Sequence, residues 1–266
     1  MGGIGKTTLA QLVYDDNRVK EHFDLKAWVC VSNEFDVFDI TKTILETVGS
    51  STDSDRKDLN LLQVKLKEKI MGKKFLIVLD DVWSENYADW EALSNPFTYC
   101  RVIVTTRGEH VAVAMRSAIT HRLKQLPEED CWSLFAKQAF REGDLEAYPK
   151  LQVIGREIVK KCHGLPLAAK AVGSLLWSKV DINEWNKILK SELWDLQNDM
   201  VIPALRLSYQ YLPFHLKRCF AYCSIFPQDY GFEKEELILL WMAEGFLQQS
   251  KEKTLEQVGD DYFCIW

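Results

Sequence analysis

The chain has 266 residues, of which 47% are hydrophobic and 27% are charged, and its formal net charge is −6. This composition fits an ordinary globular protein of about two domains and excludes disordered, collagen-like and low-complexity chains. The acidic balance argues against non-specific nucleic-acid binding, and no apolar run approaches the roughly 20 residues that a membrane span needs.

The first residues, Gly2-Gly3-Ile4-Gly5-Lys6-Thr7-Thr8, match most of the phosphate-binding pattern G-x-x-x-x-G-K-[ST]. In such a loop, backbone N–H groups and a helix N-terminus surround phosphate oxygens. Lys6 is predicted to reach the β and γ phosphates and Thr7 to hold Mg²⁺. The alternative, a merely flexible loop, does not explain why Lys-Thr-Thr leads straight into a helix. Because the first glycine of the pattern and the strand before it would precede Met1, we expect a fragment of a longer protein.

Strand-like and helix-like segments alternate over the first half of the chain. Short apolar runs predict buried strands at 26–31, 74–79 and 102–105. Helical patterns predict helices at 7–14, 38–48 and 59–71, while 15–24 reads as a polar turn and 49–57 as a surface loop. The alternation predicts an α/β fold with a mostly parallel, doubly wound sheet whose first strand is missing.

The second strand ends at two consecutive acids, Asp80 and Asp81. A parallel strand that follows a phosphate loop delivers such a carboxylate beside the phosphates, where Asp80 would hold Mg²⁺ through water. Asp81 could act catalytically by orienting a hydrolytic water, and a simple solvated carboxylate is an equally good reading. Arg107 follows the third strand, where its planar fork suits a γ-phosphate. The alternative for Arg107 is a surface arginine paired with a nearby acid.

From Leu126 onward, helical patterns replace the alternation, at 131–140, 151–162, 165–177 and 203–211. Residues 213–247 mix helix-like runs with a turn at 226–231, which suits a small helical or winged-helix unit. We therefore predict three parts. They are a P-loop nucleotide-binding subdomain over 1–125, a helical subdomain over 126–212 and a truncated winged-helix subdomain over 213–266.

The ordered set of motifs resembles one family, the NB-ARC domain of plant nucleotide-binding leucine-rich repeat (NLR) immune receptors. The motifs are GGIGKTT, HFDLKAWVCVS, KKFLIVLDDVW, RVIVTTR, LKQLPEEDCWSLFAKQAF, GLPLA and CFAYCSIFPQDYGFEKEELILLWMAEGFL, and they span essentially the whole chain. Trp83 at the end of LDDVW, together with the KAWVCVS strand, resembles the coiled-coil class of these receptors rather than the TIR class.

The resemblance implies a switch in plant defence, held off by ADP and turned on by ATP. By resemblance, Gly3, Gly5, Lys6, Thr7 and Thr8 bind phosphates and Mg²⁺, Asp80 supports Mg²⁺, Arg107 senses the γ-phosphate, and Pro166 packs near the adenine. It also implies coiled-coil and leucine-rich repeat domains in the full-length protein, and it allows self-association of the activated receptor. The seven scattered cysteines favour reduced thiols over a disulfide framework or a zinc site, so we expect a cytoplasmic protein.

Three function classes compete on the sequence. The leading one is a regulatory nucleotide switch with at most slow ATP hydrolysis, because nothing supplies both an assured base and an arginine finger. The runner-up is a fast P-loop ATPase or kinase with Asp81 as its base, although no acceptor-substrate motif is apparent. The third is a DNA-binding winged-helix regulator, which the three basic and five acidic residues between 214 and 249 argue against.

Overall fold

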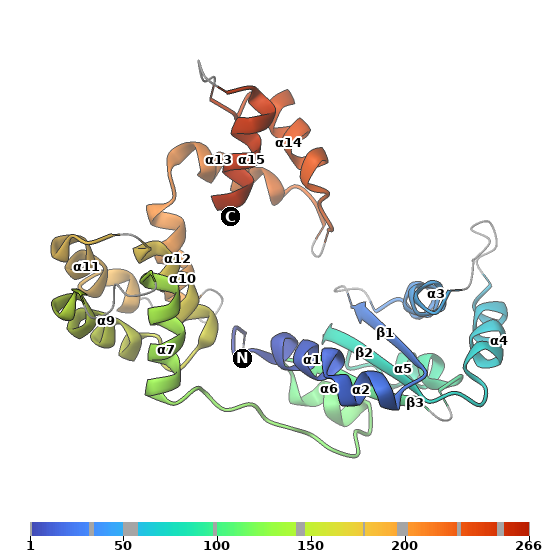
Figure 1. Cartoon of the computed structure of the whole chain (residues 1–266). Coiled ribbons are helices and arrows are strands. Elements are labelled where there is room, and N and C mark those ends of the chain that lie inside the picture. Colours follow the sequence, from blue (N-terminus) through green and yellow to red (C-terminus); the bar gives the residue numbers. More distant parts are fainter. Residues whose placement is uncertain are drawn as a thin grey trace. The chain divides into compact units, whose positions relative to one another are not determined.

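The computed structural model describes residues 2–31, 35–49, 58–97, 100–141, 147–177, 179–195, 202–227, 230–248 and 253–265. The chain divides into two compact units, residues 1–124 and residues 125–266 (Figure 1). Each unit has hydrophobic clusters of its own. Within the ranges given above, every helix is too short or too polar to cross a membrane. Residues 50–57, most of the predicted surface loop, lie outside those ranges.

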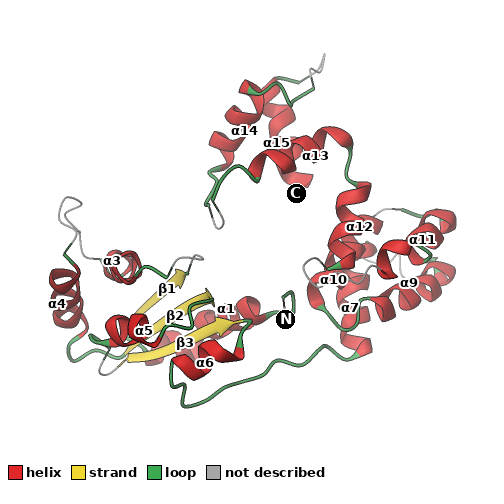
Figure 2. Cartoon of the chain, turned by 180° about the vertical axis from the view of Figure 1, so that it is seen from behind, coloured by secondary structure: helices red, strands yellow, loops and turns green. Residues whose placement is uncertain are grey.

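The first unit is built on a parallel sheet in the order β1-β2-β3 (Figure 2). Its strands are β1 (Leu25–Cys30), β2 (Phe75–Val82) and β3 (Cys100–Thr106). The central strand β2 is buried at all but one position, whereas Val102 of β3 is 39% exposed. Central parallel strands covered on both faces read as continuous apolar runs. The predicted parallel sheet is confirmed.

Helices cover the two faces of β2. The helices of this unit are α1 (Lys6–Asp15), α2 (Asn17–His22), α3 (Val37–Thr47), α4 (Leu59–Ile70), α5 (Tyr87–Ser94) and α6 (Glu109–Ala114). Phe75, Ile77 and Leu79 share one buried cluster with residues of α3, α4 and α5. The alternate residues point to the opposite face, where Asp80 bonds to the first turn of α1. The fold therefore places the start of α1 beside the end of β2.

The structure corrects several sequence-based boundaries in this unit. The segment 15–24 is not only a turn but contains α2, because the Asp16 side chain caps the helix by accepting from the Arg18 N–H at 2.9 Å. Helices α5 and α6 were not predicted. β2 continues past Asp80 and Asp81 to Val82. The helices predicted at 7–14, 38–48 and 59–71 are confirmed as α1, α3 and α4.

In the described residues of the second unit, all regular secondary structure is helical. It holds α7 (Glu128–Ala139), α9 (Pro149–Lys161), α10 (Pro166–Leu176), α11 (Ile182–Leu189), the 3-10 helix η1 (Glu192–Asp195), α12 (Pro203–Tyr211), α13 (Phe214–Cys223), α14 (Lys234–Ala243) and α15 (Leu255–Ile265). One cluster packs Phe135 and Trp185 edge to face, and another surrounds Trp241 of α14. The four predicted helices are confirmed, while α11 and α15 were not predicted. The three subdomain boundaries remain a prediction.

Candidate functional site

The glycine-rich loop leads directly into α1. Gly3 and Gly5 have φ angles of 71° and 96°, a left-handed conformation that glycine adopts without strain. Gly5 is the N-cap residue of α1, and a glycine has no side chain with which to cap the helix. The first intrahelical bond runs from the Leu9 N–H to the Gly5 carbonyl at 2.9 Å. The backbone N–H groups that precede Leu9 in the first turn therefore have no acceptor within the helix itself. Such a helix start suits an anionic ligand.

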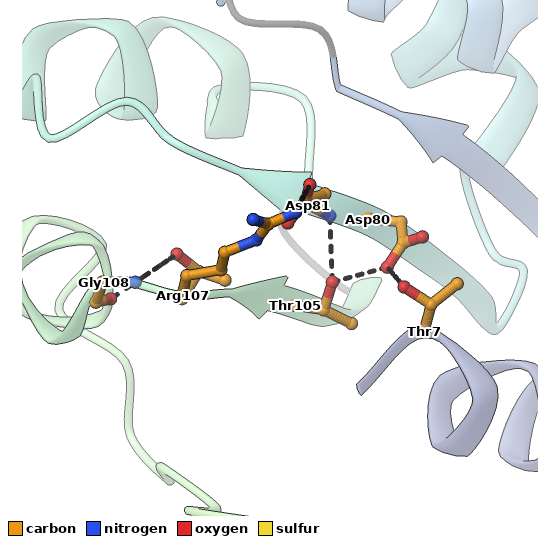
Figure 3. Close-up of polar contacts among 7 residues, drawn as sticks. Thr7, Asp80, Asp81, Thr105, Arg107 and Gly108 are labelled. Atoms are coloured by element: carbon orange, nitrogen blue, oxygen red, sulfur yellow. Dashed lines mark hydrogen bonds and ion pairs between the residues drawn. The ribbon is translucent and has the colours of Figure 1, made fainter. Parts of the chain in front are cut away.

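Asp80 ties the start of α1 to the sheet (Figure 3). The Thr7 hydroxyl donates to Asp80 Oδ1 at 3.1 Å, and the Thr105 hydroxyl of β3 donates to the same oxygen. Only 5% of Asp80 is exposed, which makes these hydrogen bonds necessary for a buried carboxylate. Asp80 and Thr7, both predicted to hold Mg²⁺, therefore lie side by side.

A β-bulge separates the roles of the two consecutive acids. Leu79 pairs with Val104 and Val82 pairs with Thr106, so Asp80 and Asp81 together face Thr105 alone. Asp81 has a φ of 54°, a left-handed angle that aspartate adopts more readily than most residues. Its backbone N–H donates to the Thr105 hydroxyl at 2.9 Å. The bulge aims the Asp81 side chain at a different partner from that of Asp80.

That partner is Arg107, just beyond β3. Arg107 Nη2 lies 3.2 Å from Asp81 Oδ2, and its guanidinium carbon lies 4.9 Å from the centroid of the Trp83 ring. The Gly108 N–H donates to Thr106 Oγ1 at 3.1 Å, which fixes the turn around Arg107. The structure thus shows the arginine paired with a nearby acid, at the carboxyl edge of the sheet where a phosphate sensor was predicted.

Lys6 lies among these charges and is partly buried. Burial lowers the pKa of Lys6, and the positive charge of Arg107 lowers it further, while the carboxylates of Asp81 and Asp80 oppose this shift. Two cations are thus close enough to repel each other beside the glycine-rich loop. An anion in this position would relieve that repulsion. Thr8, the remaining predicted phosphate ligand of this loop, is exposed in the first turn of α1.

Pro166, the last predicted site residue, belongs to the second unit and opens α10. The turn before it is tight: a Cβ on Gly164, whose φ is 65°, would lie 2.6 Å from the Leu126 carbonyl oxygen. The Leu126 N–H donates to the Gly164 carbonyl at 2.9 Å. A cavity of about 340 Å³ lies beside this turn, and Gly164 lines it while Pro166 does not. The adenine contact of Pro166 remains a proposal.

Sequence reasoning missed two members of the site. Thr105 connects Asp80 to the Asp81 backbone, and Trp83 stacks on Arg107. A usable signal existed for Thr105, because it lies two residues before Arg107 on the strand that pairs with the acid-bearing strand. The contact of Trp83 with Arg107 depends on the bulge, and no periodicity in the sequence predicts that bulge.

The sequence pattern described as the NB-ARC domain matches residues 1–145, and that of the disease resistance protein winged helix domain matches residues 225–265. Among solved structures, the Aeropyrum pernix ORC2 protein in its ADP form is similar in fold. It has a TM-score of 0.52 and 13% identity, and the match covers 99% of this chain and 84% of that one. This likeness supports the predicted α/β P-loop NTPase fold followed by a helical part.

Curated relatives come from plants. The chain is 48% identical to the putative disease resistance RPP13-like protein 1 of Arabidopsis thaliana, a match that covers 99% of this chain and 26% of that protein. It is 46% identical to the disease resistance protein RGA2 of Solanum bulbocastanum, covering 100% of this chain and 28% of that protein. The chain thus spans about a quarter of the length of these relatives. With the NB-ARC pattern covering more than half of its residues, the chain belongs to the NB-ARC family.

Proposed function

We propose that this chain is the ADP- and ATP-binding switch module of a plant immune receptor. The observation that carries the proposal is the 3.1 Å hydrogen bond from Thr7 to Asp80. It brings together the hydroxyl of a glycine-rich loop and a buried acid from the end of a parallel strand. The plant disease resistance relatives support the biological setting.

The donor set at Thr7 and Asp80 fits Mg²⁺. A hydroxyl and a carboxylate oxygen are hard oxygen ligands, and Mg²⁺ in nucleotide sites takes one or two protein ligands together with phosphates and waters. A larger cluster is not required, and the described residues hold no group of three His, Cys, Asp or Glu side chains that could bind a metal. When bound, Mg²⁺ would neutralise phosphate charge.

The proposed phosphate ligands are Gly3, Gly5, Lys6, Thr7 and Thr8. The backbone N–H groups of the loop would donate to phosphate oxygens, and the Lys6 ammonium would meet the β and γ phosphates. Arg107 would contact the γ-phosphate, and Pro166 would pack near the adenine. These roles agree with the two converging cations and the uncapped helix start.

We propose that hydrolysis is slow at most. Asp81, the candidate residue for orienting water, binds Arg107 at 3.2 Å and would be open to a water only once Arg107 has moved away. P-loop proteins that lack an arginine finger in place turn over slowly.

In a longer protein like its relatives, the module would be off with ADP and on with ATP. We propose three subdomains with limits at 1–125, 126–212 and 213–266, which the three separate hydrophobic clusters support. Coiled-coil and leucine-rich repeat domains of the same protein would be its intramolecular partners. The activated form would self-associate, and the protein would act in the cytoplasm.

The test is calorimetric titration of ADP into the wild-type chain and the Lys6→Ala variant. Loss of a charge-assisted phosphate contact is expected to cost about 1.5–3 kcal/mol, or roughly 10- to 150-fold in Kd. Lys20→Ala is the matched control, because it removes the same charge from α2, where Lys20 is 47% exposed and pairs with Asp15. Equal ADP affinity for wild type and Lys6→Ala would contradict the proposed phosphate loop.

A further inference from the structure

Trp83 has a position that the proposed nucleotide contacts do not explain. It directly follows β2 and is 41% exposed. Its ring lies beneath Arg107, with 4.9 Å between the ring centroid and the guanidinium carbon. A guanidinium at this distance from an indole face is held by a cation–π interaction. Trp83 therefore contacts the proposed sensor without being a phosphate ligand.

Arg107 is held from two sides at the edge of the phosphate loop. Asp81 binds one amino group at 3.2 Å, and Trp83 covers the flat face. The other amino group points toward the loop, because a Cβ built on Gly2 would lie 3.4 Å from Arg107 Nη1. This arrangement is a resting position of Arg107 beside the proposed phosphate site, and it is formed by protein groups alone.

A γ-phosphate competes with this resting position. Guanidinium groups bind carboxylates and phosphates through the same in-plane N–H donors. If Arg107 moves toward a phosphate, the Asp81 backbone cannot move with it. Its N–H donates to the Thr105 hydroxyl, and its backbone is fixed in the bulge. Arg107 must therefore leave Asp81, at least in part, to place its fork on a phosphate.

We propose that Trp83 is a positioning residue that holds Arg107 against Asp81 and opposes its transfer to the γ-phosphate. The inference rests on the proposed nucleotide-binding function and specifies how the site discriminates between a nucleoside diphosphate and a triphosphate. A diphosphate leaves Arg107 on Trp83 and Asp81. A triphosphate binds only by drawing the guanidinium away from the indole, so the contact biases the site toward the diphosphate.

Substitution at Trp83 isolates this effect because tryptophan carries no charge. Replacing Asp81 would also remove a negative charge near the phosphates and so would favour ATP for a second reason. Trp83→Leu removes the aromatic face, whereas Trp83→Phe keeps a weaker one. An exposed cation–π contact changes an equilibrium about two- to fivefold. The ratio of the ADP Kd to the Kd of a non-hydrolysable ATP analogue should rise by that factor in Trp83→Leu.

The experiment measures both Kd values by calorimetry with Mg²⁺ on the 266-residue chain and its variants. Trp83→Phe should restore a ratio close to that of wild type, which a merely structural loss would not do. Trp177→Leu is the matched control, because Trp177 is 45% exposed and lies 5.8 Å from Arg141 in the second unit. Its ratio should equal that of wild type.

A second readout follows the contact itself. In chains labelled with 5-fluorotryptophan, the Trp83 fluorine signal is assigned by its loss in Trp83→Phe. The ATP analogue should shift this signal, and ADP should leave it in place. An unchanged or lowered ratio in Trp83→Leu, or equal shifts with both nucleotides, would overturn the inference while nucleotide binding stands. Absence of binding of either nucleotide to the wild type would overturn the proposed function and this inference with it.

Discussion

Two helices that begin at glycine-containing turns, α1 and α10, are packed very differently. In α1, Ala10 is the one buried residue, and Leu12 is 67% exposed. α10 buries five residues, among them Leu176, which is completely covered. α1 is instead anchored by polar and aromatic contacts, including the bond from Thr7 to Asp80 and the edge-on contact of Tyr14 with Trp28. Within these 266 residues, the helix that bears the proposed chemistry is therefore held mainly by its first turn and by Tyr14 rather than by core packing.

The largest expected contrast between the two helices is in their leucines. Leu176→Ala should lower the free energy of unfolding by about 2–5 kcal/mol, because it leaves a cavity among closely packed neighbours. Leu12→Ala should change it by no more than about 0.5 kcal/mol, because the side chain is largely in water already. Urea denaturation of both variants measures the contrast. Equal losses would show that α1 is packed as firmly as α10.

An intermediate effect is expected where α1 is anchored to the sheet. Thr7→Val keeps the shape of the side chain but removes the hydroxyl that donates to Asp80, which should cost about 0.5–1.5 kcal/mol without nucleotide. Thr8→Val makes the same change at the next position, which is exposed as Thr7 is, and should be nearly neutral because the bond to Asp80 is kept. If urea denaturation gives the same free energy of unfolding for the two variants, the contact between Thr7 and Asp80 does not stabilise α1.

The smallest expected effect concerns the charge of Lys6. Its pKa in the folded chain lies below the ordinary value of 10.5, so the unfolded chain holds this proton more tightly. The stability of wild type relative to Lys6→Met should therefore rise as the pH increases through the folded pKa toward 10.5, and stay constant below that window. We expect a gain within about 0.5 kcal/mol because Lys6 is partly exposed. Urea midpoints across this range test it, and a falling difference would reverse the sign of the pKa shift.

Much of the fold follows from local sequence. Continuous apolar runs mark β1, β2 and β3, and helical spacing marks α1, α3 and α4, because burial on defined faces dictates those patterns. The short helices α2, α5 and α6 were missed because each has eight residues or fewer and depends on a local cap or on packing. In α5 the Asn86 side chain accepts from the Ala88 N–H at 3.0 Å. Such caps are as common in turns as at helix starts.

The candidate site is predictable only in part. Motif spacing indicates Lys6, Thr7 and Asp80, because a phosphate loop and an acid-bearing strand must meet at one sheet edge. Nothing in the spacing shows that Asp81 faces Arg107, since a regular strand would send it to the opposite face from Asp80. That pairing, and the contact with Trp83, comes from the backbone conformation at Asp81.

The bulge in β2 has a consequence for how this strand is compared with others. Val82 lies in the same buried cluster as Leu79, although an uninterrupted alternation would place the two on opposite faces. The pairing of β2 with β3 is regular on both sides of the bulge only if Asp81 is left out of the count, so this residue acts as an insertion within the strand. An alignment that counts residues instead of ladder partners would equate Val82 with outward-facing positions elsewhere. Gain or loss of one residue at this point would alter the partner of Arg107 and leave the sheet intact.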